Sequence, residues 1–396
     1  MAKLSELASI NPRIVDKPNL DDVVAFLPMA VVDAELGTAV AREERSFRVV
    51  SKGFTLFEDR DILVAKITPC FENGKIAQAE LSTRIGAGST EFHVVRPDRS
   101  RVNERFLLHL LRHPRIRTAG EQRMTGSAGQ RRVPASYIAG LEMPVPPLPE
   151  QERAADVLDS VNGLRVKRRA ALTRLRMLTQ SIFLELFGDP VRNDRGWPRV
   201  PLGSLLQQIQ SGHSPRCMDR PVVDGEWGVL KLGAVTSCEF NPDQNKALPH
   251  GIEPHLEDEV QAGDLLFSRK NTRELVAACV LVQETVPRLL MPDLIFRLKL
   301  ADKADVDPAF LHQLLIFPSK RRVIQNLAGG SAGSMPNISK AKLREVQIEL
   351  PPLSLQREFA RQLESIEKMK TAQRQHLAEL DSLFASLQDR AFRGEL

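Results

Sequence analysis

Cysteine and long apolar runs are both scarce in this sequence. The four cysteines of the 396-residue chain are Cys70, Cys217, Cys238 and Cys279, and none belongs to a Cys-x-x-Cys pair. This spacing argues against a zinc site and a disulfide framework, so we expect no bound metal and a reducing, cytoplasmic location. No segment approaches 18 consecutive apolar residues, and the N-terminal segment lacks the layout of a signal peptide. We therefore expect neither a transmembrane helix nor a secretion signal.

Common catalytic motifs are missing as well. The sequence contains no G-x-x-x-x-G-K phosphate loop, no G-x-S-x-G, no H-E-x-x-H, and no Asn-Pro-Pro-aromatic or Asp-Pro-Pro-aromatic tetrapeptide of the kind that amino-methyltransferases use. His109 and His113 stand four residues apart on an expected helix, and without further ligands we interpret them as a surface pair. The composition, 42% hydrophobic and 27% charged, is that of a folded chain. We expect a protein that is not itself an enzyme.

What the sequence does contain is an internal repeat of about 200 residues. Four blocks return in the same order at offsets of 203 to 205 positions, which favours two copies of one unit over chance similarity. A duplication with one idle copy is the alternative. The blocks are DILVAKIT (61–68) with DLLFSRKN (264–271), RFLLHLLRHP (105–114) with AFLHQLLIFP (309–318), GSAG (126–129) with GSAG (330–333), and PVPPLPEQ (144–151) with ELPPLSLQ (349–356).

Each copy is expected to contain a globular part followed by a long helix. The globular parts hold short apolar runs bounded by turn residues, typical of strands, and short helices that end at a proline. The strand candidates are DILVAKI, EFHVVRP, GDLLFS, AACVLV and DLIFRLKL. We predict an α+β fold with two globular, strand-rich α/β domains and two long helices. The boundaries are 1–145 and 189–350 for the globular domains, and 146–188 and 351–396 for the helical regions.

The two long helices are expected to pack against each other. From 151 to 186 and from 356 to 391 the sequence keeps an apolar 3-4 spacing typical of a coiled coil. Each helix would be about 54 Å long, and the linker 187–200 is short, so an antiparallel pair with one domain at each end and an approximate twofold axis fits best. The predicted seam residues are Leu158, Val161, Leu172, Leu175, Ile182, Leu363, Ile366, Leu377, Leu380 and Leu387.

Positive charge is concentrated in one segment of each copy. The whole chain has a net charge of +5, whereas 112–132 carries six arginines with one acid and 316–344 carries six Lys or Arg with none. A solvated face is the alternative for one such run, but two runs at matching positions, each with a GSAG loop, favour contact with a nucleic-acid backbone. The candidates are Arg123, Ser127, Arg131, Arg132, Lys320, Arg321, Arg322, Ser331, Ser334, Asn337 and Lys340.

A second candidate surface follows an apolar run in each copy. The second copy reads SRKNTRE (268–274), and Arg suits guanine while Asn suits adenine in a major groove. An ordinary turn between strands is the alternative. The candidate residues are Lys66 and Lys75 in the first copy and Arg269, Lys270, Asn271 and Arg273 in the second.

The order of these features resembles the specificity subunits of type I restriction–modification systems. The likeness covers nearly the whole chain, although the first copy departs from it with DILVAKITPC in place of DLLFSR and with GQRRVPAS in place of an Asn-Ile-containing loop. The segments that carry it are PPLPEQERAADVL (147–158), WPRVPLGSLL (197–206), GDLLFSRKNTRELV (263–276) and GGSAGSMPNIS (329–339).

This resemblance implies a non-catalytic chain whose two target recognition domains each read one half of a split site in double-stranded DNA. The helix pair would set the spacing of the halves and would dock two methyltransferase subunits, with restriction and translocase subunits in the same complex. S-adenosylmethionine, ATP and Mg²⁺ would belong to these partners, with no cofactor and no metal in this chain. Basic residues of the first helix would contact spacer phosphates or partners. They are Arg165, Lys167, Arg168, Arg169, Arg174 and Arg176.

Two alternatives remain open at this point. The chain could be the specificity half of an otherwise fused restriction–methylation enzyme, or a coiled-coil scaffold that binds protein and no DNA. A gel shift with random-sequence DNA at low salt separates the scaffold from the DNA-binding alternatives.

Overall fold

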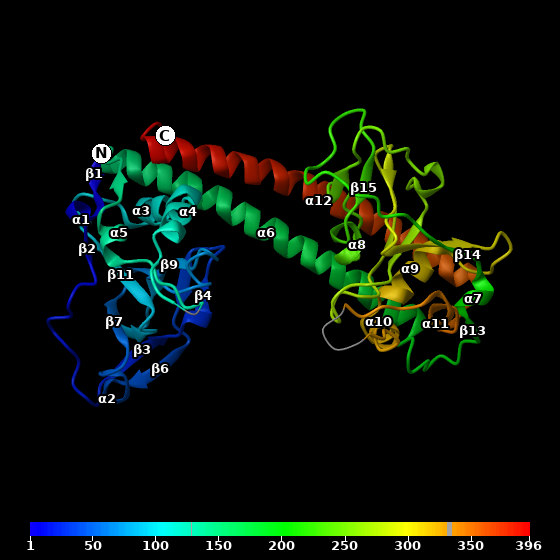
Figure 1. Cartoon of the computed structure of the whole chain (residues 1–396). Coiled ribbons are helices and arrows are strands. Elements are labelled where there is room, and N and C mark those ends of the chain that lie inside the picture. The colour runs from blue at the N-terminus through cyan, green and yellow to red at the C-terminus, as the bar shows by residue number, and fades with distance from the viewer. Residues whose placement is uncertain (128, 331–334) are drawn as a thin grey trace. The chain divides into compact units, whose positions relative to one another are not determined.

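The structure, a computed structural model, describes residues 1–127, 129–330 and 335–396 and forms two compact units (Figure 1). Unit 1 comprises Met1–Leu172 and Ala372–Leu396, and unit 2 comprises Thr173–Thr371. The boundary passes through the two long helices, α6 (Leu148–Phe187) and α12 (Leu353–Arg393). Each long helix therefore contributes one portion to each unit.

Unit 1 is built around two sheets. The larger has the strand order β2-β11-β8-β9-β5-β4 and the other the order β6-β3-β10-β7, while β1 pairs with β12 directly before α6. The strands are β1 (Ala2–Lys3), β2 (Ala8–Ile10), β3 (Val23–Leu27), β4 (Val32–Asp33), β5 (Thr38–Val40), β6 (Glu43–Ser46), β7 (Thr55–Glu58), β8 (Ile62–Ala65), β9 (Ile76–Glu80), β10 (Ile85–Gly88), β11 (Phe92–Pro97) and β12 (Glu142–Met143). The helices are α1 (Leu4–Leu7), η1 (Met29–Val31), α2 (Phe47–Val50), α3 (Glu104–Leu111), α4 (Pro114–Gln122) and α5 (Ala135–Ala139).

Unit 2 repeats this arrangement in a shorter form. Its sheets have the orders β14-β20-β17-β18 and β16-β15-β19, and β13 pairs with β21 before α12. The repeat predicted from sequence is therefore also a repeat of topology. The strands are β13 (Arg199–Pro201), β14 (Leu206–Ser211), β15 (Gly228–Leu230), β16 (Asn245–Ala247), β17 (Leu265–Ser268), β18 (Cys279–Leu281), β19 (Leu289–Leu290), β20 (Ile295–Leu300) and β21 (Gln347–Glu349). The helices are α7 (Leu202–Leu205), α8 (Gly233–Thr236), η2 (Leu256–Asp258), α9 (Pro308–Ile316), α10 (Pro318–Gln325) and α11 (Lys340–Arg344).

The apolar runs and the prolines act as the sequence predicts. The five strand candidates correspond to β8, β11, β17, β18 and β20, and every residue of β8 and β17 is buried. Helices α3 and α9 end just before Pro114 and Pro318, each of which is the first residue of the next helix. Proline suits that position because it has no N–H to leave unpaired. The α+β fold with two strand-rich parts and two long helices is confirmed.

The two long helices run antiparallel within unit 1. Arg165 of α6 lies 2.6 Å from the carboxylate of Asp381, and Arg168, one turn further on, donates to Gln373 at 2.9 Å, so rising numbers on α6 meet falling numbers on α12. The helices contain 40 and 41 residues, somewhat more than the 36 expected, because each begins directly after its Pro-Pro pair. In the part of the chain that the structure describes, no helix has the length and apolar character to cross a membrane.

The predicted helix seam is only partly buried. Leu158, Val161, Leu363 and Ile366 are buried. The remaining predicted seam residues keep some exposure; they are Leu172, Leu175, Ile182, Leu377, Leu380 and Leu387.

The PPL-x-x-Q signature has the same structural role in both units. Gln151 and Gln356 are fully buried, and each donates through its amide nitrogen to two backbone carbonyls. The side-chain oxygen of Gln151 accepts from the N–H of Asn103, and that of Gln356 accepts from the N–H of Asp307, both at 2.8 Å. Asn103 and Asp307 cap the N-termini of α3 and α9. Each glutamine therefore fixes a long helix to the adjacent globular part.

His109 and His113 are buried, so their interpretation as a surface pair is wrong. His109 of α3 contacts the carboxylate of Asp159 on α6 at 2.8 Å, and His113 contacts that of Asp389 on α12 at 2.9 Å. Burial lowers the pKa of both imidazoles. The i, i+4 pair lies on the face of unit 1 that packs against the long helices.

His312 of α9 is expected to make unit 2 sensitive to acid. Its Nε2 donates to the carbonyl of Cys279 at 3.1 Å, and burial lowers the pKa of the ring from 6.5 to about 4. Below pH 6.5 the unfolded chain takes up a proton that the folded chain does not, so the free energy of unfolding falls toward pH 4, by about 3 kcal/mol. The replacement His312→Gln keeps an N–H donor and should remove most of this loss.

This prediction can be tested by denaturation at pH 7.0 and pH 4.5. The only tryptophans, Trp197 and Trp227, both belong to unit 2, so their fluorescence reports on that unit. The matched control is His250→Gln, at a side chain that is 87% exposed. An equal pH dependence in the wild type and in His312→Gln would contradict the assignment.

Candidate nucleic-acid interface

Two loops meet in unit 1. Residues 66–75 connect β8 to β9, and the described residues of 123–134 belong to the connection from α4 to α5. The N–H of Thr68 donates to the carbonyl of Arg131 at 3.0 Å, and the N–H of Val133 donates to that of Lys66 at 2.8 Å. The sequence predicted two separate candidate surfaces here. The structure joins them, and we call the two segments loop pair 1.

Unit 2 contains the equivalent arrangement. Residues 269–278 connect β17 to β18, and the described residues of 326–339 belong to the connection from α10 to α11; together these form loop pair 2. The N–H of Ile338 donates to the carbonyl of Arg269 at 2.8 Å, which reproduces the bond from Val133 to Lys66. Gly329 and Asn337 exchange two backbone hydrogen bonds, as Thr125 and Arg132 do in loop pair 1.

The first GSAG segment contains a turn that requires glycine. Gly126 has a φ of 128°, and a Cβ there would lie 2.7 Å from the carbonyl oxygen of Gln130. Its neighbour Ser127 is exposed. In the second segment, Ser331 and Ser334 lie outside the described residues.

An arginine–carboxylate contact fixes each loop pair to the strand behind it. In loop pair 1, Arg132 donates to both oxygens of Glu91 at 2.9 and 2.7 Å; this contact raises the pKa of Arg132 and lowers the pKa of Glu91. In loop pair 2, Arg269 donates to the Asp293 carbonyl at 2.6 Å and to Asn337 Oδ1 at 3.2 Å, and its guanidinium lies 3.3 Å from the Asp293 carboxylate. Glu91 and Asp293 lie just before the equivalent strands β11 and β20. Arg132, Arg269 and Asn337, predicted as DNA contacts, therefore hold the loops in place.

Lys320 and Asn271 are buried, which contradicts their prediction as surface contacts. Lys320 is 4% exposed, and its ammonium lies 2.5 Å from Glu349. Burial lowers the pKa of Lys320 despite this partner. Asn271 is 6% exposed, and its oxygen accepts from the N–H of Thr272 at 2.8 Å. Both side chains stabilise unit 2 rather than facing a ligand.

Two further predicted contacts are used within their own units. Arg321 donates to the carbonyl of Leu275 at 3.2 Å, which holds α10 against loop pair 2. Lys75 donates to the carbonyl of Met29 at 2.8 Å. These long side chains cross from one segment to another, so only part of their charge faces outward.

Other predicted cations remain accessible on both loop pairs. The ammonium nitrogen of Lys340 lies 5.6 Å from the ring centroid of Phe296, and the guanidinium carbon of Arg269 lies 5.5 Å from the same centroid. The two cations therefore lie near the same buried ring. Such side chains can contact phosphates and position a loop on a duplex, while neighbouring groups reach base edges. The exposed cations are Arg123 and Arg131 in unit 1 and Arg273, Arg322 and Lys340 in unit 2, and the half-buried ones are Lys66 and Lys270.

The basic residues of α6 are partly neutralised within each unit. Arg165 and Arg169 both contact Asp381, at 2.6 and 3.1 Å, and Arg176 contacts Glu239 at 3.1 Å. These arginines therefore offer a phosphate or a partner less free charge than the sequence suggests.

Sequence reasoning missed the residues that support the loops. His93 of β11 is buried, and its Nε2 donates to the carbonyl of Val133 at 2.9 Å. Glu91 and Asp293 were missed as well, although each is the first residue of a run that the sequence predicts as a strand, EFHVVRP and DLIFRLKL. An acidic residue at the start of a predicted strand was the signal that could have identified them.

Comparisons with known proteins find relatives of this chain by sequence and by structure. No protein-family model matches the chain. The specificity subunit of the type I restriction enzyme EcoEI of Escherichia coli is 29% identical over 446 aligned positions, which cover 89% of this chain and 75% of that protein. The EcoAI specificity subunit of Escherichia coli is 42% identical over 151 residues, a local match that covers 38% of this chain and 26% of the relative.

A solved structure shares the fold. The S subunit of a type I restriction–modification system from M. genitalium aligns with 99% of this chain and 95% of its own, with a TM-score of 0.59 and 12% identity. At this identity the likeness concerns the fold alone.

Proposed function

Because the chain belongs to the specificity subunits of type I restriction enzymes, we propose that it reads a two-part DNA sequence, one part with each loop pair. The observation that carries this proposal is the equivalence of the two loop pairs. They join equivalent strands and helices, each loop pair is joined by an equivalent backbone hydrogen bond and contains an equivalent two-bond exchange, and both present exposed cations.

The two loop pairs are suited to read different sequences. They share backbone hydrogen bonds, but the side chains at equivalent positions differ, as with Lys66 and Arg269 or Arg132 and Asn337. Cations of either loop pair would contact phosphates and set the register, and nearby groups would discriminate between bases, at about 1–3 kcal/mol per base pair. Because one chain reads two short sites, the free energies by which each site discriminates against wrong base pairs add together.

The proposal includes partner subunits. Two methyltransferase subunits would dock on the chain and use S-adenosylmethionine to methylate adenine in each half-site. Restriction and translocase subunits would supply the ATP- and Mg²⁺-dependent steps. This chain would contribute recognition and no catalytic group, and the complex would act on DNA in the cytoplasm.

Genome-wide mapping of adenine methylation tests this function. We expect one bipartite motif to be methylated in the native host, to lose methylation when the gene is deleted, and to regain it when the gene returns. A methylated motif of two separated halves is the result expected if each loop pair recognises one half. A methylation pattern that does not change on deletion would contradict the proposal and would favour the protein scaffold.

A further inference from the structure

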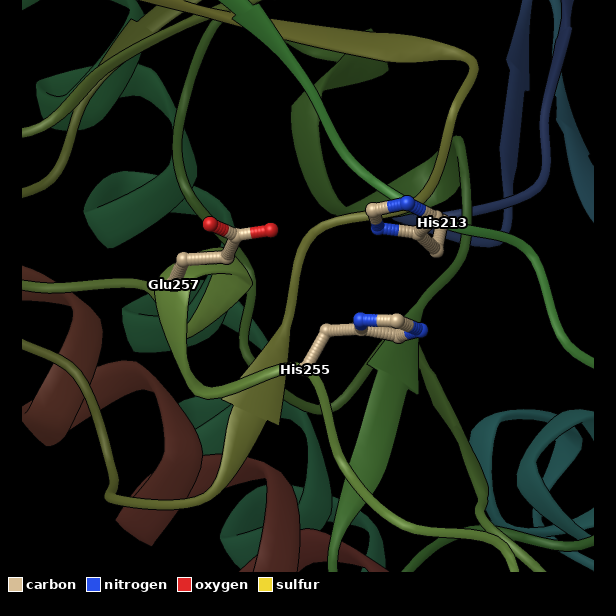
Figure 2. A group of neighbouring side chains, drawn as sticks. All are labelled: His213, His255 and Glu257. Atoms are coloured by element: carbon tan, nitrogen blue, oxygen red, sulfur yellow. The ribbon is translucent and has the colours of Figure 1, made fainter.

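Three side chains of unit 2 that the proposed function does not use form a compact cluster. The ligand atoms of His213, His255 and Glu257 all lie within 4.8 Å of one another. Figure 2 shows the two imidazole rings facing each other, with the carboxylate of Glu257 beside them. We propose that these three residues form a binding site for a divalent transition-metal ion, with Zn²⁺ as the probe.

The donor set suits such an ion. Two imidazoles and one carboxylate are common ligands of Zn²⁺, whereas Mg²⁺ and Ca²⁺ prefer sites made of oxygen alone. His255 directly precedes η2 and Glu257 lies within it, so one turn of chain supplies two of the three ligands. His213 comes from the connection between β14 and β15, so a bound ion would fix that connection to η2.

A buried carboxylate already orients one of the ligands. Asp258 is 1% exposed, and its carboxylate accepts from Nδ1 of His213 at 2.6 Å. This leaves Nε2 of His213 as the available ligand atom, the arrangement that metal-binding histidines usually adopt.

The two rings have room to move into a coordinating geometry. Their centroids are 4.0 Å apart and their planes are inclined by 14°. Because an imidazole lone pair lies in the plane of its ring, the stacked rings must tilt to bring both nitrogens about 2.0–2.1 Å from one ion. The side chain of His213 is 51% exposed, and His255 and Glu257 are also exposed, so little packing opposes this rotation.

The surroundings favour a cation. The two histidines line a pocket of about 300 Å³ that also contains the acidic side chains of Glu253 and Asp258. The cysteine spacing led us to expect no metal, but cysteine spacing carries no information about a site of imidazole and carboxylate. His213 and His255 are also too far apart in sequence to form a recognisable motif.

Zinc titration of the full chain, without a histidine tag and without DNA, tests the site. We expect one Zn²⁺ per chain in competition with a fluorescent chelator, with affinity at least ~10-fold weaker in His255→Ala and in Glu257→Gln. Asp258→Asn should lower the affinity for Zn²⁺ by about 10–100-fold, because it removes the carboxylate that orients His213. The control His250→Ala removes an exposed histidine of the same unit outside the cluster and should bind as the wild type does.

Cobalt provides a second readout. Co²⁺ should give visible absorption bands with the wild type that are lost in His213→Ala, while circular dichroism shows that the variant remains folded. Absence of stoichiometric binding, or equal Zn²⁺ affinity in the wild type and in His255→Ala, would overturn the proposal. Neither result bears on DNA recognition, which is measured separately.

Discussion

Replacing Arg273, Arg322 and Lys340 together by alanine is expected to weaken binding to every DNA sequence and to reduce its dependence on salt. All three side chains are exposed on or beside loop pair 2. If each contacts one phosphate, the slope of log K against log salt falls by about 0.9 per contact, or about 2.7 in all. The loss of affinity between 50 and 200 mM salt should then shrink by roughly 40-fold. Binding should be measured for the complex on cognate and on random DNA across that range.

The matched control for this triple variant is Lys303→Ala. Leu266 pairs with Arg297 and Ser268 with Ile295 in antiparallel register, so β20 runs away from loop pair 2 toward Lys303. This lysine is exposed beyond the opposite end of the strand, and its removal should leave the salt slope unchanged. An unchanged slope in the triple variant would show that loop pair 2 does not contact phosphate, and a changed preference among bases would instead indicate base contacts.

The strands and long helices of this protein could be predicted from sequence because they depend on local patterns, whereas the strand order within the sheets was not predicted. Runs such as DILVAKI and DLIFRLKL contain enough consecutive apolar residues to mark β8 and β20 as buried strands. The repeated PPL-x-x-Q segments marked the start of both long helices, since proline suits a helix start and interrupts a helix interior. These signals involve neighbours in sequence, and the structure confirms them.

The roles of the individual cations could not be predicted, because their partners are distant in sequence. Arg269 contacts Asp293 and Asn337, which are 24 and 68 residues away, and the partner of Lys320 is 29 residues away. Counting charge within a window detects a basic segment but not which of its side chains fold inward. The sequence therefore located the two basic surfaces and overestimated their free charge.

The histidines of α3 and α4 illustrate the same limit. The spacing of four predicted one helix for His109 and His113, but α3 ends at Leu111 and His113 caps the N-terminus of α4; the spacing also did not say whether the two rings face solvent. Asp159 and Asp389 decide the question, and both come from the long helices. Burial follows from the packing of the helices, which no local pattern encodes.

The differences between the two units are as informative as their similarity. Both need an arginine–carboxylate contact to hold the loops against the sheet, yet Arg132 supplies it from the second loop of pair 1, whereas Arg269 supplies it from the first loop of pair 2. Both units therefore hold their loops by the same kind of contact, although the position of the arginine and the neighbouring side chains differ. A rigid scaffold with variable loops is how one fold can recognise different ligands.

Phe183→Ala is expected to destabilise unit 2 by about 3–5 kcal/mol. Phe183 of α6 is 1% exposed, and its ring centroid lies 5.1 to 5.9 Å from those of three aromatic rings in other parts of the unit. Those rings belong to Phe310 of α9, Phe317 between α9 and α10, and Phe359 of α12. Truncation would leave a cavity where the long helices meet the globular part, and both the buried apolar area and the aromatic contacts would be lost.

The adjacent residue supplies the control for this variant. Leu184 is 44% exposed on the same turn of α6, so Leu184→Ala should change the free energy of unfolding by no more than about 0.5 kcal/mol. Urea denaturation followed by tryptophan fluorescence measures both variants on unit 2, since Trp197 also donates its indole N–H to the Phe187 carbonyl at 2.9 Å, next to the aromatic cluster. If Phe183→Ala costs no more than Leu184→Ala, the junction between helix and globular part does not depend on this cluster, and the buried glutamine contacts must hold it instead.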